Sequence, residues 1–348
     1  MNATAGFLPV AASLMILLSC GGSAHSNNPQ MVPGSLVLTH YHLTGDTSPV
    51  RDPSIIRQGS TYYLFSTDAG GPVAGHLPLR CSKDKINWNL CGAVFDQIPV
   101  WVQAQVPGID ALWAPDISYF NGLYHLYYAG SQFGTNTSVI GLATNSTLDA
   151  SDPAYQWIDQ GLVLKSSTSN DFNAIDPSIL IDTDGKIWLT YGSYWTGIKQ
   201  QQLDPLTGKL MANNQTVYSV ATRPSVQFDP IEGSSLVHRG RYYYLFVSFD
   251  DCCNPNPYKD TYRIMVGRSN TVHGPFNDQN GVAMMDGGGT QLLAGNGTTW
   301  NAPGGETVFI DPQQSDLITF HALRLPDGAA YMFVNSLSWP DDWPEIEP

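Results

Sequence analysis

The sequence predicts an all-β fold, a five-bladed β-propeller, because one pattern of strands and turns recurs along the chain. In this pattern an acidic residue precedes a short apolar strand, a Gly-containing turn follows, and an aromatic-rich strand comes next. Four units are opened by an acid, at Asp52, Asp116, Asp176 and Glu232, and these acids are 64, 60 and 56 residues apart (52 to 116, 116 to 176 and 176 to 232). A repeat of that length with several strands per unit is typical of propeller blades.

The units follow one another in the same order along the chain. The first strands cover 52–56, 116–118, 176–181 and 231–236, and the second strands cover 62–66, 124–128, 187–193 and 242–246. A strand of small residues that ends in a polar turn recurs at 79–84, 140–146 and 265–271. A fifth unit fits the tail, at 306–311, 318–322 and 330–334, and it diverges most because it has no acid in an Asp-Pro context.

Length, composition and charge limit the partners. The chain has 348 residues, 42% of them hydrophobic, which is enough for one large all-β domain. Only 13% of the residues are charged and the net charge is −14. Such a surface repels nucleic acid and anionic membranes. We therefore expect a monomer that binds a neutral polymer, with no nucleic-acid or membrane partner.

The N-terminal segment predicts secretion. An apolar run at about 11–18 precedes small residues and is too short to span a bilayer, so we expect a signal peptide over 1–24. The alternative is a lipoprotein signal, because Leu-Leu-Ser-Cys at 17–20 would place an acylated Cys20. We expect a flexible leader over 25–45 and a single propeller domain over 46–348.

Four cysteines remain after Cys20. Cys81 and Cys91 flank a predicted hairpin and could pair in an oxidising compartment. Cys252 and Cys253 are adjacent in the sequence, so they form either a disulfide between neighbours or two free thiols. The sequence contains no Cys-x-x-Cys motif, which argues against a zinc site.

The repeated acids predict a chemical site. The first strand of each propeller blade lines the central channel, so Asp52, Asp116, Asp176 and Glu232 should converge on one cavity. One Asp-Pro-Ser sequence means little, because such sequences are common in turns. Several carboxylates at close range are costly and shift pKa values, which a fold tolerates mainly when it uses them.

Paired carboxylates with separated pKa values carry out glycoside hydrolysis. One stays ionised and activates water, and the other keeps its proton for the leaving oxygen. In inverting enzymes the two stand about 6.5–9.5 Å apart, a gap that suits opposite sides of a channel. A third acid between them could raise the pKa of the proton donor.

Other side chains have two interpretations each. Most strand tyrosines should pack between blades. Trp113 stands at the start of a channel strand and Phe133 follows a strand end, so each either packs or stacks on a sugar ring. His321 lies on an apolar strand and is either a buried, hydrogen-bonded histidine or a metal or substrate ligand.

Four motifs resemble glycoside hydrolase family 43, and within it most closely the endo-1,5-α-L-arabinanases. They are Leu-Trp-Ala-Pro-Asp at 112–116, Asp-Phe-Asn-Ala-Ile-Asp-Pro at 171–177, Gly-Ser-Tyr-Trp-Thr-Gly-Ile at 192–198 and Ile-Glu-Gly at 231–233. The second is the most specific, because its Asn-Ala-Ile-Asp run is typical of arabinanases. The resemblance covers about 46–343.

The resemblance implies a secreted, inverting hydrolase of internal bonds in arabinan or arabino-oligosaccharides. Asp52 would be the general base, Glu232 the general acid, and Asp176 the residue that orients the acid and raises its pKa. Arabinose contacts are expected from Asn173, Ala174, Ile175, Ser193, Tyr194 and Trp195. His321 would lie near a calcium or sodium ion in the channel.

The chain departs from the family pattern at three places. Arg51 stands where a histidine usually precedes the base, the loop 68–78 is longer and holds His76, and Gly304-Gly305-Glu306 replaces a common histidine. These differences concern the binding groove and leave the endo mode open. An exo-acting α-L-arabinofuranosidase or β-xylosidase is the first alternative, favoured if the loop 68–78 closes one end of the groove. A non-catalytic carbohydrate-binding propeller is less favoured, because all three acids are in place.

Overall fold

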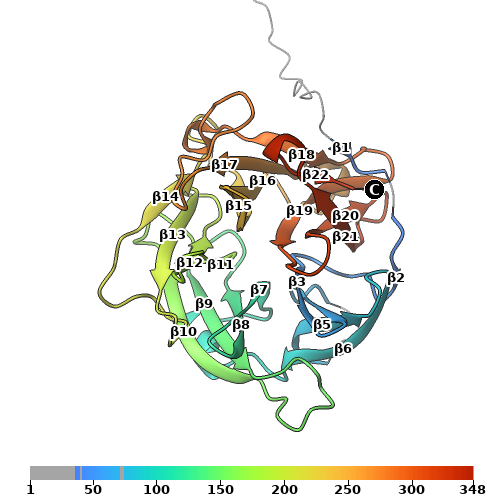
Figure 1. Ribbon diagram of the computed structural model, residues 1–348, viewed down its shortest axis with the longest axis vertical. Coiled ribbons are helices and arrows are strands. Elements are labelled where there is room, and N and C mark those ends of the chain that lie inside the picture. Colours follow the sequence, from blue (N-terminus) through green and yellow to red (C-terminus); the bar gives the residue numbers. More distant parts are fainter. Residues whose placement is uncertain (1–35, 40, 71–73, 348) are drawn as a thin grey trace, which may run out of the picture. The chain divides into compact units, whose positions relative to one another are not determined.

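A computed structural model describes residues 36–39, 41–70 and 74–347, which form one compact unit within 32–348. The predicted signal peptide, Cys20 and most of the predicted leader lie outside the described residues. Five sheets, each with four successive antiparallel strands, stand around a central axis (Figure 1). The prediction of an all-β, five-bladed propeller is therefore confirmed. Within the described ranges, no helix is both long and apolar enough to cross a membrane.

Blades 1 and 2 come from the first half of the chain. Blade 1 contains β3 (Ser54–Gln58), β4 (Thr61–Phe65), β5 (His76–Ser82) and β6 (Asn87–Phe95), with β2 (Thr44–Gly45) parallel to β6. The helix α1 (Val100–Gln105) leads to blade 2, which contains β7 (Trp113–Phe120), β8 (Leu123–Gly130), β9 (Ser138–Asn145) and β10 (Ile158–Ser166).

Blades 3, 4 and 5 complete the circle. Blade 3 contains β11 (Ser178–Ile181), β12 (Ile187–Tyr191), β13 (Ile198–Leu203) and β14 (Tyr218–Ala221). Blade 4 contains β15 (Ile231–Arg239), β16 (Tyr242–Phe249), β17 (Arg263–Ser269) and β18 (Thr290–Ala294), with β1 (Leu36–Val37) parallel to β18 and the 3-10 helices η1 (Pro257–Lys259) and η2 (Met284–Asp286) in its connections. Blade 5 contains β19 (Trp300–Phe309), β20 (Leu317–Arg324), β21 (Ala330–Ser338) and β22 (Glu345–Ile346), with η3 (Pro340–Asp342) before the last strand.

Tight turns and buried aromatic residues shape the blades as the sequence predicts. The hairpin from β7 to β8 turns on Asn121 and Gly122, whose φ angles of 49° and 77° are those that a two-residue hairpin loop requires. Tyr127 and Tyr128 are fully buried, and the Tyr127 hydroxyl donates to the carbonyl of Gly208 at 2.9 Å. Packing between blades is therefore the role of these strand tyrosines.

The innermost strands β3, β7, β11, β15 and β19 are joined by hydrogen bonds from blade to blade. In four of the five junctions, a backbone N–H of one inner strand donates to a side chain of the preceding one: Ile117 to Ser54 (3.1 Å), Ile179 to Asp116 (2.9 Å), Leu236 to Ser178 (3.3 Å) and Val308 to Ser235 (3.0 Å). At the fifth junction the Thr307 hydroxyl donates to the Pro53 carbonyl at 2.8 Å. We call this set of contacts the inner ring.

Asp116 belongs to the inner ring and not to the cavity, so its predicted place among the converging acids is wrong. The repeat in blade 2 is offset by two residues. Ala114, with φ of 40°, stands where Asp52 (48°) and Asp176 (54°) stand in blades 1 and 3, and a proline follows each. Asp116 thus takes the position of Ser54 and Ser178 and accepts a backbone N–H between strands.

The first and last blades meet at a seam. The Arg57 guanidinium forms two 2.7 Å bonds with the Asp311 carboxylate across it. The Val50 amide donates to the carbonyl of Ala330 at 3.1 Å on the same seam. The propeller is closed there by side chains and isolated backbone bonds, since each blade takes its four antiparallel strands from one continuous stretch of chain.

Candidate active site

A cavity of about 1040 Å³ is lined by residues from the beginnings of the inner strands of all five blades. Of the residues that the sequence predicts for the site, the lining includes Asp52, Trp113, Phe133, Asn173, Ile175, Asp176, Ser193, Tyr194, Trp195, Glu232 and His321. Three of the four acids that were predicted to converge therefore line one cavity, and Asp116 does not.

Ala174 is the exception among the predicted substrate-binding residues. Its side chain is fully buried among core residues of blades 2 and 3, and its N–H donates to the Ser166 hydroxyl at 2.9 Å. Along 173–175 the side chains alternate in direction, so Asn173 and Ile175 reach the cavity and Ala174 points into the core. The expectation of a contact between Ala174 and substrate is corrected accordingly.

Asp52 is more accessible than Glu232, with its side chain 28% exposed. Thr67 donates its hydroxyl to Asp52 Oδ2 at 2.5 Å, and the Asp52 N–H donates to His321 Nδ1 at 3.2 Å. Burial raises the pKa of Asp52, while the Thr67 hydrogen bond and the Arg51 charge oppose the rise. A carboxylate held from one side and open to the cavity on the other suits the activation of a water molecule.

Gly304 and Gly305 of blade 5 leave no room for a side chain. A Cβ on this residue would stand 2.2 Å from Asp52 Oδ1 and 2.9 Å from His321 Nδ1, and its φ is 58°. A Cβ on Gly304 would stand 2.3 Å from the Tyr262 ring. Gly305 therefore allows blade 5 to approach Asp52, and Gly304 allows it to approach the Tyr262 ring.

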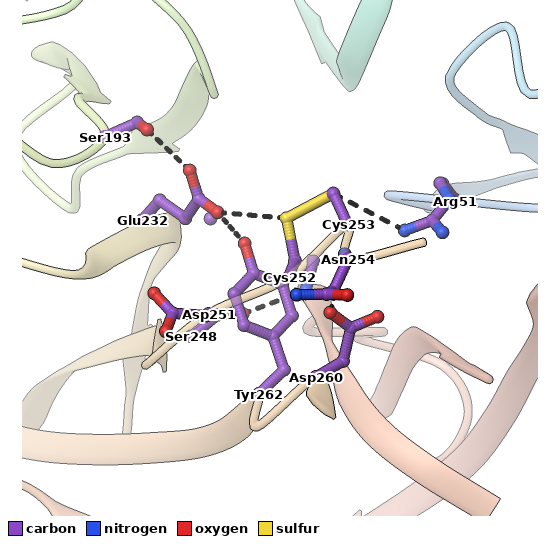
Figure 2. Close-up of a disulfide and its surroundings, with 12 residues drawn as sticks. Arg51, Ser193, Glu232, Ser248, Asp251, Cys252, Cys253, Asn254, Asp260 and Tyr262 are labelled. Carbon is purple, nitrogen blue, oxygen red and sulfur yellow. Dashed lines mark hydrogen bonds between the residues drawn. A yellow bond between two sulfur atoms is a disulfide. The ribbon is translucent and has the colours of Figure 1, made fainter. Parts of the chain in front are cut away.

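Glu232 is buried and hydrogen-bonded on both of its oxygens (Figure 2). The Ser193 hydroxyl donates to Oε2 at 2.5 Å, and the Tyr262 hydroxyl donates to Oε1. Burial raises the pKa of Glu232 to about 7, and the charges of Asp52 and Asp251 add to the rise. A carboxyl group with that pKa retains a proton near neutral pH, as a general acid requires.

Asp176 lies between the other two acids in the order of the blades. It accepts the N–H of Gly233 on Oδ2 at 3.0 Å. Burial raises the pKa of Asp176 well above its usual range, and the charges of Glu232 and Asp52 add to this effect.

Glu306 is a further acid that lines the cavity, and the sequence did not single it out. It is buried, and the Ser248 hydroxyl donates to its Oε2 at 2.7 Å. Burial raises the pKa of Glu306 to about 8, so it is neutral at pH 7. The fifth unit therefore does carry an acid, next to Gly304 and Gly305 and outside any Asp-Pro context, where the repeat gave no signal for it.

Aromatic side chains form the outer part of the cavity. Phe133 is 74% exposed and Trp195 is 38% exposed, while Trp113 is half-buried. Phe228, which the sequence did not indicate, lines the cavity and is also 74% exposed. Exposed aromatic faces around a polar floor are the usual surface for stacking sugar rings, since these rings are apolar on their C–H faces.

The loop 68–78 is anchored at the cavity by Asp68. This carboxylate accepts from the N–H groups of Leu77 at 2.6 Å and Leu112 at 2.8 Å, and it contacts His76 Nδ1 at 2.7 Å. Asp68 and Ala69 line the cavity, whereas residues 71–73 lie outside the described part of the chain. His76 therefore has a partner within its own loop.

The His321 ring, on β20, is buried beside Asp52. Burial and the Arg51 charge lower the pKa of His321 well below its usual range, so the ring is neutral. The ring has two possible tautomers. In the first, Nδ1 accepts the Asp52 N–H and Nε2 carries the proton. In the second, Nδ1 carries the proton, 3.5 Å from Asp52 Oδ1, and the lone pair of Nε2 is available as a ligand. Among the described residues, no group of three or more His, Cys, Asp or Glu side chains could hold an ion, so water would supply most ligands.

Both cysteine pairs, whose state the sequence left open, form disulfides. Cys81 and Cys91 join β5 and β6 in blade 1, and the adjacent Cys252 and Cys253 are bonded to each other. The second pair lines the cavity (Figure 2), a position that the sequence did not predict. The cavity thus brings together an accessible carboxylate, a proton-holding carboxyl and aromatic walls, which can hydrolyse a bond whose leaving oxygen needs a proton.

Comparison with known proteins gives a consistent result. The model of the family described as Glycosyl hydrolases family 43 matches residues 47–344. The chain is 39% identical over 297 residues to an extracellular endo-alpha-(1->5)-L-arabinanase of Bacillus subtilis, covering 85% of this chain and 87% of the relative. It is 37% identical over 311 residues to an extracellular exo-alpha-(1->5)-L-arabinofuranosidase of Cellvibrio japonicus, covering 86% of each.

Solved structures agree with these relatives. A family 43 endo-arabinanase from Bacillus licheniformis superimposes with a TM-score of 0.78 and 39% identity, covering 88% of this chain and all of the other. A Cellvibrio cellulosa alpha-L-arabinanase complexed with arabinohexaose gives a TM-score of 0.79 and 34% identity, covering 87% and 96%.

Proposed function

The chain belongs to glycosyl hydrolase family 43, and on that premise we propose that it is an inverting endo-arabinanase that cleaves internal α-1,5-L-arabinofuranosyl bonds of arabinan. The observation that carries the proposal is the contrast between two carboxyl groups of one cavity. Asp52 is partly exposed, and the Thr67 hydrogen bond and the Arg51 charge counteract the rise of its pKa that burial causes. Glu232 is buried, and its pKa is raised to about 7.

Asp52 is the proposed general base. Its carboxylate takes a proton from a water molecule, which attacks the anomeric carbon from the face opposite the leaving oxygen. The Thr67 hydroxyl fixes the direction of the carboxylate through Oδ2, and His321 Nδ1 lies 3.5 Å from the other oxygen, Oδ1. The Gly305 backbone lies directly against Asp52 Oδ1, where even a Cβ would come within 2.2 Å.

Glu232 is the proposed general acid, which gives its proton to the glycosidic oxygen as the bond breaks. Ser193 and Tyr262 hold the carboxyl group by both oxygens and so limit its rotation. Asp176, bound to the Gly233 N–H next to Glu232 in sequence, is proposed to orient the acid and to keep its pKa high when charged.

The endo mode rests on the relatives and on the width of the cavity. A cavity of about 1040 Å³ with aromatic residues from blades 2, 3 and 4 has room for several sugar rings. The exo-acting alternative is supported by the Cellvibrio japonicus relative, whose identity to this chain is only slightly lower. A β-xylosidase would use the same acids with a differently shaped sugar site.

The products from linear 1,5-arabinan test the proposal. An endo enzyme releases a series of oligosaccharides early and lowers the viscosity quickly, whereas an exo enzyme releases one product size from the start. Arabinan left intact together with cleavage of β-xylosides would overturn the arabinanase assignment. Binding of arabinan without any cleavage would support the carbohydrate-binding alternative.

Secretion is proposed on the same grounds. Two relatives of high similarity are named extracellular, and two disulfides favour an oxidising compartment. Cleavage after about residue 24 should leave a soluble monomer, whereas acylation of Cys20 would leave the enzyme on a membrane. Mass spectrometry of the N-terminal peptide from the native host distinguishes the two.

We also propose one calcium or sodium ion in the channel, held by His321 Nε2 and by water. The ion would offset part of the negative charge of the acids and orient water near Asp52. Chelation should lower kcat, and added calcium should restore it. His321→Ala should remove the bound metal measured by elemental analysis and abolish the response to chelator. A wild-type protein without bound metal, and full activity in His321→Ala, would contradict a metal role.

A further inference from the structure

The adjacent disulfide stands directly beside the candidate proton donor (Figure 2). Cys252 Sγ lies 3.6 Å from Glu232 Oε1, on the same oxygen that accepts the Tyr262 hydroxyl. Arg51 Nη1 lies 3.7 Å from Cys253 Sγ. The disulfide therefore lies between the acid and the residue that precedes the base, and both cysteines line the cavity.

The loop that carries this disulfide is fixed by other contacts. It runs from 250 to 262, between β16 and β17. Asp250 binds Arg263 and Arg223 at 2.7 Å each. The Asn254 N–H donates to Asp260 at 2.7 Å, and the carbonyl of Asp260 accepts from Asn301 at 2.8 Å. Because these bonds do not involve sulfur, the loop should keep its path when the disulfide is removed.

A disulfide between neighbours adds little to global stability. The stabilisation that a disulfide provides increases with the length of chain that it closes, and two adjacent residues close the shortest one. The Cys81–Cys91 bond has a separation of ten residues, joins two strands and packs against the core of blades 1 and 2. The position of Cys252–Cys253 in the cavity therefore points to a local role at the site.

Oxidised sulfur offers Glu232 an apolar surface. A disulfide sulfur carries no hydrogen, so Cys252 cannot donate to Glu232 Oε1 and instead keeps water away from it. The sugar that departs with the protonated oxygen must lie on the cavity side of the same carboxyl group. A rigid pair of sulfur atoms is a suitable surface for the C–H face of that ring.

We propose that the oxidised Cys252–Cys253 pair positions the Glu232 proton donor and forms the apolar wall against the sugar on the leaving-group side. The proposal rests on the proposed function of Glu232. A dithiol reductant would supply two electrons and two protons, break the sulfur–sulfur bond, form two thiols and close into its own disulfide. The freed Cys252 thiol can then donate to Glu232 Oε1, and the wall loses its fixed shape.

The consequence for the pH profile has a definite sign. A hydrogen bond to the charged form lowers the pKa of a carboxyl group, so the alkaline limb of kcat/KM should move to lower pH after reduction. The other groups near Glu232 keep their chemistry on reduction: Asp52, Asp176, Asp251, Glu306, Arg51, Tyr194 and Tyr262. A shift is then assigned to the thiol.

The test compares two disulfides in one protein. Wild type, Cys252→Ala/Cys253→Ala and the control Cys81→Ala/Cys91→Ala are assayed on linear arabinan, with and without dithiol, and thiols are counted at each step. Reduced wild type and the Cys252→Ala/Cys253→Ala variant should lose about tenfold in kcat/KM, as for loss of a small apolar contact. Reoxidation should restore wild type. The control should keep both full oxidised activity and its response to dithiol.

Four outcomes are decisive. Full kcat/KM in Cys252→Ala/Cys253→Ala, or an unshifted pH profile in reduced wild type, would overturn the inference while the proposed function stands. The dithiol response could instead persist in Cys252→Ala/Cys253→Ala and disappear in Cys81→Ala/Cys91→Ala. That result would assign the effect to the Cys81–Cys91 disulfide and overturn the inference. Absence of arabinan cleavage in oxidised wild type would overturn the proposed function, and the inference would fall with it.

Discussion

Two aspartates on neighbouring inner strands, Asp116 and Asp176, stand in similar sequence surroundings and occupy different places. Asp176 precedes Pro177 and lines the cavity, where its pKa responds to the charge of Glu232. Asp116 follows Pro115, accepts the Ile179 N–H, and belongs to the inner ring that joins the blades. A shift of two residues in the repeat separates a group of the candidate site from a group of the scaffold.

This comparison yields two classes of variant with opposite signatures. Substitutions of cavity acids should change kcat/KM and leave the free energy of unfolding near the wild-type value. Substitution of the inner-ring acid should do the reverse. Each prediction below tests that division.

The largest effect is expected for Asp52→Asn. The attacking water loses its base, so activity should fall by about 10³-fold or more on both arabinan and activated aryl arabinosides. Kinetics on the two substrates measure the loss. The first product of the wild-type enzyme, observed by proton NMR, should have the inverted anomeric configuration. A retained configuration would remove the role given to Asp52.

Glu232→Gln should be nearly as severe on arabinan and mild on good leaving groups. We expect a loss of about 10²- to 10⁴-fold for the polysaccharide, because its leaving oxygen needs a proton. An aryl glycoside whose phenol leaving group has a low pKa needs little protonation. Glu232→Gln should therefore cleave it at a rate close to that of wild type. Equal losses on both substrates would argue against Glu232 as the proton donor.

Asp176→Asn should lower kcat/KM by about tenfold and change the pH profile. The enzyme needs protonated Glu232, so activity falls as pH rises through the pKa of Glu232, about 7. If Asp176 is charged in the active enzyme, its removal lowers that pKa, and the alkaline limb moves to lower pH. A lower rate with an unchanged profile would mean that Asp176 orients Glu232 without tuning it.

Asp116 variants should have the smallest effect on activity and the clearest effect on stability. Asp116→Ala leaves the partly buried Ile179 N–H without its acceptor, which costs about 1 kcal/mol or more, whereas Asp116→Asn retains an oxygen. Urea unfolding measures the difference, with kcat/KM as the control. A loss of activity in Asp116→Asn without loss of stability would place Asp116 in the site.

The pH dependence of stability distinguishes Asp116→Asn from wild type. Burial raises the pKa of Asp116 to about 7 from a usual value of 3.8. The folded protein therefore holds a proton that the unfolded chain releases. The stability from this group is complete below about pH 4 and declines as pH rises through 7. Asp116→Asn has no such proton, so its stability relative to wild type should rise between about pH 4 and 7 and stay level above pH 7.

The sequence predicted the blade count, the hairpins and the three cavity acids, because these follow from local patterns repeated at a regular spacing. It misplaced Asp116, because an Asp near a proline does not by itself show which residue of the repeat it is equivalent to. In blade 2 the residue before the proline is Ala114. It also missed Glu306, Tyr262 and the cavity position of Cys252. These groups reach the site through the bulges and loops of blades 4 and 5, where strand periodicity carries no information about direction.

The seam between blades 5 and 1 determines when a newly made chain can become active. Asp52 lies in the first blade, yet its neighbour His321 is 269 residues later in the chain, and Gly305 is also in the last blade. A chain that emerges N-terminus first exposes Asp52 long before these partners exist. Hydrolytic competence should therefore appear in one step at the end of synthesis, when blade 5 docks. A partly made molecule would carry the acids but not the site.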